Sequence, residues 1–82
     1  MSTVREVVEV LARALTDRHE EIRVVETEVK GTIVIELYVA PGEVGRVVGK
    51  QGKTAAALRT LAATAGEKLG KTVTLEIRDG RR

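Results

Sequence analysis

The 82-residue chain contains no cysteine. Without thiols it can form no disulfide, no thiolate zinc site and no cysteine nucleophile, and nothing indicates an oxidising compartment. Its apolar runs are far shorter than the roughly 18 residues that cross a bilayer. Acidic residues also occur near the N-terminus, where a secretion signal is basic and then apolar. We therefore expect a cytoplasmic chain without a membrane segment.

Aromatic side chains are almost missing as well, because Tyr38 is the only one. Domains that stack nucleic-acid bases on a sheet need two or three exposed rings. This chain cannot build such a platform. If it binds a nucleic-acid strand, an aliphatic groove must hold the bases and the strand must be held through its phosphates.

Residues for catalysis are equally scarce. Ser2 is the only serine and His19 the only histidine, so no Ser-His-Asp set can be assembled. His19 follows the first predicted helix, where a histidine usually complements the helix dipole. We expect no enzyme, no catalytic residue, no metal site and no cofactor.

Charge is divided unevenly between the two halves of the chain. The net charge is only +2, but residues 1–43 carry five Lys and Arg against nine Asp and Glu, a net of −4. Residues 44–82 carry nine against three, a net of +6. A local field of this sign attracts polyanions, so the second half is the candidate binding region.

The first half of the chain predicts a helix and a hairpin. Apolar residues recur at helical spacing over residues 3–16, and they alternate with polar ones over residues 22–29 and 32–40. Lys30-Gly31 supplies the turn between two antiparallel strands. On the outer face of this sheet we expect three carboxylates: Glu26, Glu28 and Glu36.

The second half predicts two helices and a strand. A short helix covers residues 43–48, Gly49 to Gly52 forms a tight connection, and a long helix starts at Lys53. Its apolar stripe contains Leu58, Leu61, Ala62, Ala65 and Leu69. Gly66 interrupts it at a cost of about 1 kcal/mol relative to alanine. Residues 71–79 form the last strand, with a short basic tail over 79–82.

The predicted order α-β-β-α-α-β indicates one α+β domain over residues 1–82. A strand, two helices and a strand form a crossover, so the last strand runs parallel to one of the first two. The result is a three-stranded mixed sheet that helices cover on one face.

Between the last two helices lies the stretch Val47-Val48-Gly49-Lys50-Gln51-Gly52-Lys53-Thr54-Ala55. Its Gly-x-x-Gly tetrad lets the backbone approach a phosphate chain, and a lysine inside the loop adds charge. With this motif in this element order, the chain resembles a KH domain of the bacterial, type II arrangement. It is similar over nearly its whole length to the small single-domain proteins of the KhpA family.

The resemblance implies binding of single-stranded RNA, with about four nucleotides in a groove beside the loop. Backbone N–H groups of the loop and of the following helix face the phosphate there, and the helix dipole favours its charge. Ala55 is smaller than the aliphatic residue of the family motif, which leaves base preference open. The implied RNA-binding residues are Val44, Gly45, Arg46, Val48, Gly49, Lys50, Gln51, Gly52, Lys53, Thr54, Ala55 and Arg59, with Leu58 beside the apolar floor.

The resemblance also implies protein partners and cellular roles. Related proteins form homodimers or pair with a larger KH protein of the KhpB (Jag) type, and act in cell elongation and division or as post-transcriptional RNA chaperones. The alternative function is therefore a protein-pairing module with secondary RNA binding, which would use the acidic half of the chain.

A bare turn stays open as an interpretation of the motif, whereas a nucleotide-binding P-loop does not fit it. Gly49 and Gly52 are also compatible with a bare turn between helices, and each nearby cation with an ordinary solvated charge. Gly52-Lys53-Thr54 matches the end of a nucleotide-binding P-loop, but that motif needs a glycine at position 47, which is valine.

Overall fold

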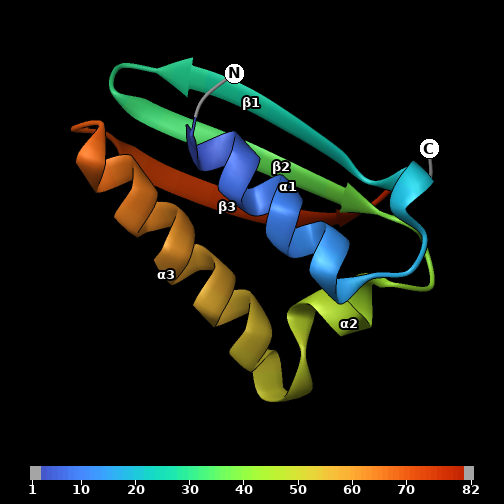
Figure 1. The fold of residues 1–82 in the computed structure, drawn as a ribbon. Coiled ribbons are helices and arrows are strands. Elements are labelled where there is room, and N and C mark those ends of the chain that lie inside the picture. The colour runs from blue at the N-terminus through green and yellow to red at the C-terminus, as the bar shows by residue number, and fades with distance from the viewer. Residues whose placement is uncertain (1–2, 81–82) are drawn as a thin grey trace.

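The computed structural model describes residues 3–80 and has the predicted element order (Figure 1). Its elements are helix α1 (Thr3–Leu15), the 3-10 turn η1 (His19–Glu21), strands β1 (Arg23–Val29) and β2 (Thr32–Val39), helix α2 (Val44–Val48), the 3-10 turn η2 (Lys50–Gly52), helix α3 (Lys53–Lys68) and strand β3 (Thr72–Asp79). The predicted boundaries agree with these to within about two residues.

The three strands form one mixed sheet in the order β1-β2-β3. β1 pairs antiparallel with β2, as the predicted hairpin requires, and β3 runs parallel to β2. α1 and α3 lie side by side across one face of the sheet, and α2 lies at one end of it (Figure 1). The sequence left open which strand pairs with β3, and the answer is the central strand β2.

The core lies between the central strand and the two long helices. β2 alternates strictly between half-buried and buried residues, as its sequence pattern predicts. Burial of one apolar side chain of this size contributes about 1.5–3 kcal/mol, so this face supplies much of the folding free energy. The fully or nearly fully buried residues include Ile33, Ile35, Leu37 and Val39 of β2, Val4, Val8 and Ala12 of α1, Leu58 and Ala62 of α3, and Leu75 of β3.

The prediction that Glu26 and Glu28 of β1 lie on the outer face of the sheet is wrong. Val24 is buried and stands opposite Leu37, which places Glu26 and Glu28 on the helix-covered side of the sheet. The reason is that β1 has valine at both Val24 and Val25, so its alternation fits either face. Glu28 forms an ion pair with Lys71, and of the three carboxylates only Glu36 lies on the open face, 3.3 Å from Arg78.

The apolar stripe predicted for α3 is only partly buried. Leu58 and Ala62 enter the core, whereas Leu61 is 48% and Leu69 44% exposed. α3 approaches the sheet along the narrow line of Leu58, Ala62 and Gly66, which recur every four residues and are all buried. Leu61 therefore faces α1 at the surface, where it lines a groove.

Gly66 allows α3 to approach β3 closely. A Cβ atom at this position would lie 2.4 Å from Cγ2 of Val73 and 2.9 Å from the carbonyl oxygen of Lys71. The glycine that appears in the sequence as a defect of the helix is thus required by packing.

The sheet continues into the predicted C-terminal tail. Asp79 belongs to β3, and the backbone N–H of Gly80 donates to the carbonyl of Val39 at 2.7 Å. The other two tail positions, 81 and 82, lie outside the described residues. On the open face of the sheet the guanidinium of Arg23 stands 4.9 Å from the ring centre of Tyr38.

Candidate nucleic-acid interface

The short helix α2 begins immediately after the turn that follows β2. The backbone N–H of Glu43 donates to the carbonyl of Ala40 at 2.8 Å, and that of Arg46 donates to the carbonyl of Glu43 at 3.0 Å. Val47 is fully buried and anchors the helix on the core. With only five residues, α2 depends on such tertiary contacts, because isolated helices this short are unstable.

The Gly-x-x-Gly loop reverses the chain between α2 and α3. Gly49 has φ 78° and ψ 173°, Gln51 has φ 58°, and Gly52 has φ 74°. The N–H of Gly49 closes α2 on the carbonyl of Gly45 at 2.8 Å, and the N–H of Gly52 donates to the carbonyl of Gly49 at 3.1 Å. Three residues with positive φ in a row of four make the compact connection that the sequence predicts.

The two glycines of the tetrad have different surroundings. A Cβ atom at Gly49 would lie 2.2 Å from Oγ1 of Thr54, so this glycine makes room for the first turn of α3. At Gly52 a Cβ atom would meet no atom within 4 Å. Gly52 is therefore the position at which the loop backbone is open to an incoming group.

Cations and backbone donors surround this opening. Lys50, Gln51 and Lys53 are exposed, and within residues 3–80 neither lysine has an ion-pair partner. Gly52 is the N-cap of α3 and supplies no side-chain hydrogen bond to the first turn. The N–H groups of that turn and the helix dipole thus favour an anion beside the two free lysines.

Arg59 reaches from α3 to the edge of the sheet. Its Nε donates to the carbonyl of Leu75 at 3.2 Å. Together with Thr74 and Glu76 it lines a hollow of about 260 Å³ between α3 and β3. Of the two arginines expected at the rim, this one lies against β3, on the strand side of the expected groove.

Arg46 does not lie against β3 as Arg59 does, because two carboxylates hold it near the end of α1. Its Nη1 lies 2.7 Å from Oδ2 of Asp17 and its Nε 3.7 Å from Oε2 of Glu43. The hydrogen bond with Asp17, followed by the charge of Glu43, raises the pKa of Arg46 above its ordinary value. No local pattern in the sequence indicates this contact, because Asp17 and Arg46 are 29 residues apart.

The expected apolar floor divides into open and covered residues. Gly45 is exposed, and Val44 and Val48 are half-buried. Ala55 is 4% and Leu58 2% exposed, so both lie beneath the surface where α3 packs on the core. Val44, Gly45 and Val48 are therefore the accessible part of the floor.

The family model described as "KhpA/KhpB, KH domain" matches residues 5–77. The chain belongs to this family. The resemblance drawn from the Gly-x-x-Gly loop and the type II element order is thereby confirmed.

Curated relatives match over almost the full chain. "RNA-binding protein KhpA" of Aquifex aeolicus is 49% identical over 77 residues, which cover 94% of this chain and 98% of the relative. The protein of the same name from Clostridium perfringens is 40% identical, covering 90% of this chain and 99% of the relative. That from Chlamydia muridarum is 36% identical, covering 95% and 100%. No solved structure was found to match.

The relatives' names describe a binding protein and not an enzyme, which confirms the expectation of a non-enzymatic chain. Within residues 3–80 no group of three or more His, Cys, Asp or Glu side chains is arranged to hold a metal ion. In the same range, none of the helices has both the length and the apolar character needed to cross a membrane.

Proposed function

We propose that this chain binds single-stranded RNA through the loop from Gly49 to Gly52, with about four nucleotides in the adjoining groove. The observation that carries the proposal is the combination of an open backbone at Gly52, two lysines without an ion-pair partner among the described residues 3–80, and a start of α3 that has no side-chain cap. The names of the curated relatives support the same function. A groove this small supports affinity on the order of micromolar, about 8 kcal/mol.

The proposed groove runs from the loop to the exposed edge of β3. Val44, Gly45 and Val48 supply its apolar floor, and Arg59 lines its far side. Thr54 packs behind Gly49 and Ala55 is nearly buried, so these two residues support the loop, while Arg46 is engaged by Asp17 and Glu43. We place this activity in the cytoplasm. Post-transcriptional regulation or RNA chaperoning linked to cell elongation and division is proposed on the family resemblance alone.

Charge reversal in the loop tests this function. We expect Lys50→Asp with Gln51→Asp to weaken binding of a short single-stranded RNA about tenfold, or about 1.4 kcal/mol, because a cation is lost and anions face the phosphates. Aspartate tolerates the positive φ of Gln51, so the fold should persist. Fluorescence anisotropy at two salt concentrations measures the affinity, and circular dichroism checks the fold.

Lys50→Asp alone has a matched control in Lys30→Asp. Lys30 lies in the β1-β2 turn and is exposed like Lys50, so both variants make the same change of charge. Lys30 has positive φ, which aspartate tolerates. The control is expected to bind within about twofold of the native chain, since it lies away from the loop. Equal binding by the folded double variant and the native chain would refute the loop as the RNA site.

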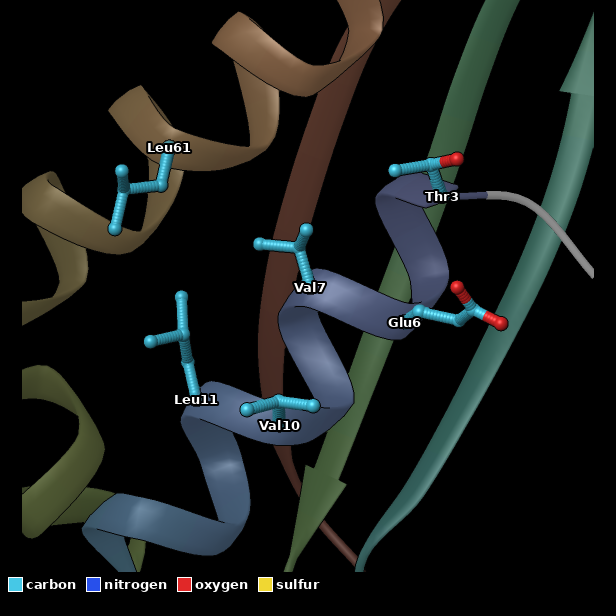
Figure 2. Close-up of a pocket in the computed structure, with 6 residues that line it drawn as sticks. All are labelled: Thr3, Glu6, Val7, Val10, Leu11 and Leu61. Atoms are coloured by element: carbon cyan, nitrogen blue, oxygen red, sulfur yellow. The ribbon is translucent and has the colours of Figure 1, made fainter.

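A second candidate function, pairing of two copies, is favoured by an apolar groove on the helical side. The groove has a volume of about 400 Å³ and lies between α1 and α3 (Figure 2). Val10 is 65% and Leu61 48% exposed there, and they come from different helices. A twofold axis across this groove would set Val10 of each copy against Leu61 of the other, which is the self-complementary arrangement of a symmetric dimer. The groove is lined by Thr3, Glu6, Val7, Val10, Leu11 and Leu61.

Leu61→Glu is expected to convert a dimer into a monomer, because a carboxylate in the centre of this apolar contact loses its hydration. Leu69→Glu is the matched control, since Leu69 is similarly exposed and directly follows the last residue of the same helix but does not line the groove. Sedimentation equilibrium measures the mass of each variant. A native chain that sediments as a monomer of 8.9 kDa would exclude self-pairing and leave a KhpB-type partner as the occupant of the groove.

A further inference from the structure

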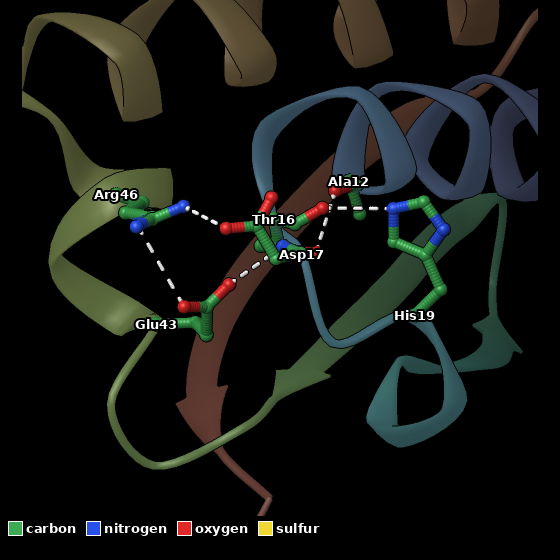
Figure 3. A network of polar contacts seen from close by, with 6 residues as sticks. All are labelled: Ala12, Thr16, Asp17, His19, Glu43 and Arg46. Atoms are coloured by element: carbon green, nitrogen blue, oxygen red, sulfur yellow. Dashed lines mark hydrogen bonds and ion pairs between the residues drawn. The ribbon is translucent and has the colours of Figure 1, made fainter.

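A cluster of charged side chains joins the end of α1 to the start of α2 (Figure 3). Glu43 precedes α2 and is only 8% exposed, although it carries a charge. Its Oε1 accepts the backbone N–H of Asp17 at 2.8 Å, and its Oε2 faces Arg46. A buried carboxylate is costly unless it is paired, and both oxygens of Glu43 have a partner here.

The segment that follows α1 is itself held in place. Both the N–H and the hydroxyl of Thr16 donate to the carbonyl of Ala12 at 3.1 Å. A ring N–H of His19 donates to the carbonyl of Thr16 at 2.8 Å, from outside the helix (Figure 3). Asp17 therefore presents its N–H and its carboxylate to α2 from a fixed support.

We infer that Asp17, Glu43 and Arg46 form a positioning cluster that sets the orientation of α2, and that Arg46 does not itself bind phosphate. The inference rests on the proposed RNA-binding function. α2 has one fully buried anchor, Val47, and Val44 packs against the core only partly buried, so the orientation of this five-residue helix depends on further contacts. The cluster provides a second anchor through Arg46 on another side of the helix.

The orientation of α2 matters because the loop follows it without a linker. The N–H of Gly49 is bound to Gly45 of α2, and the N–H of Gly52 is bound to Gly49. A tilt of α2 would therefore move the backbone donors that face the phosphate. Arg46, in contrast, directs its guanidinium to Asp17 and Glu43, so two of its nitrogens already face carboxylates.

The dependence of RNA affinity on salt separates positioning from direct contact. Each phosphate contact adds about 0.7 to the slope of log affinity against log salt for a single strand. Arg46→Gln and Asp17→Asn are each expected to weaken binding about threefold without changing this slope. Their combination is expected to be no weaker than either alone, because both break the same contact. Lys53→Gln is the control and is expected to lower the slope by about 0.7.

Amide exchange in the free protein provides a readout that needs no RNA. The N–H groups of Gly49 and Gly52 are expected to exchange about fivefold faster in Arg46→Gln and Asp17→Asn, since the loop opens more often when α2 is released. Arg46→Lys, which keeps the charge opposite Asp17, is expected to restore most of the protection. The amides of β2 serve as the internal reference for global stability.

Three results would overturn the inference. The first combines two changes: the salt slope of RNA affinity falls in Arg46→Gln as it does in Lys53→Gln, and Asp17→Asn binds RNA more tightly than the native chain. Arg46 would then be a phosphate ligand that Asp17 restrains. The second is native affinity in both cluster variants. The third is unchanged exchange at Gly49 and Gly52. Failure of the native chain to bind RNA at all, with faster loop exchange in the variants, would instead count against the proposed function.

Discussion

Gly49→Ala is expected to lower the free energy of unfolding by about 3 kcal/mol, the largest effect of any change considered for this chain. Two costs combine. With φ 78° and ψ 173°, Gly49 occupies a backbone region that is almost closed to other residues. The new methyl group would also lie 2.2 Å from Oγ1 of Thr54, so the first turn of α3 must move. Urea unfolding followed by circular dichroism measures the loss.

Gly52→Ala is the matched control for this prediction. Its φ of 74° is also positive, but no atom lies within 4 Å of the added methyl group. Only the backbone cost remains, and we expect a loss of about 1 kcal/mol. Equal losses at the two positions would show that the contact with Thr54 does not make Gly49 special.

Gly66→Ala is expected to lower the free energy of unfolding by about 2 kcal/mol, although alanine favours a helix over glycine by about 1 kcal/mol. The added methyl group would meet Val73 at 2.4 Å and the carbonyl oxygen of Lys71 at 2.9 Å. The β-branched side chain of Val73 has little rotamer freedom, so α3 must move away from β3. The same unfolding measurement tests this.

Gly42→Ala is the control for Gly66→Ala. Gly42 has no positive φ and no atom within 4 Å of an added methyl group. We expect it to stabilise the chain by about 0.5 kcal/mol, because alanine reduces the entropy of the unfolded state. A stabilising effect of Gly66→Ala would contradict the close approach of α3 and β3.

The fold was predictable because its signals are local. The strict alternation of Ile33, Ile35, Leu37 and Val39 defines a strand with one buried face, and the structure buries all four. The position of the glycine tetrad between two helical segments follows equally from neighbouring residues. Patterns of this kind depend on the periods of helices and strands and need no knowledge of distant contacts.

Other features depend on contacts between distant parts of the chain. Pairing with Ile35 decides whether Glu26 lies on the helix-covered or the open face of the sheet, because the valines of β1 fit either face. Leu61 lies in the apolar stripe of α3 but remains exposed, since Gly66 lets α3 pack closely on the sheet through a different set of residues.

The charged cluster at α2 is a further case of this kind. Arg46 looks like any other cation beside the loop, and the contact that occupies it comes from Asp17, far away in the sequence. The sequence therefore did not predict which cations near the loop are free and which form ion pairs, because this depends on tertiary structure.

The hydrogen bond from Arg59 to the carbonyl of Leu75 has a consequence for solubility. β3 is an edge strand, and exposed edges of sheets are templates on which other chains add strands and aggregate. A positively charged side chain that occupies a backbone acceptor of the edge obstructs such pairing. Arg59 therefore protects the free protein from edge-to-edge association at the same strand along which the proposed RNA groove runs.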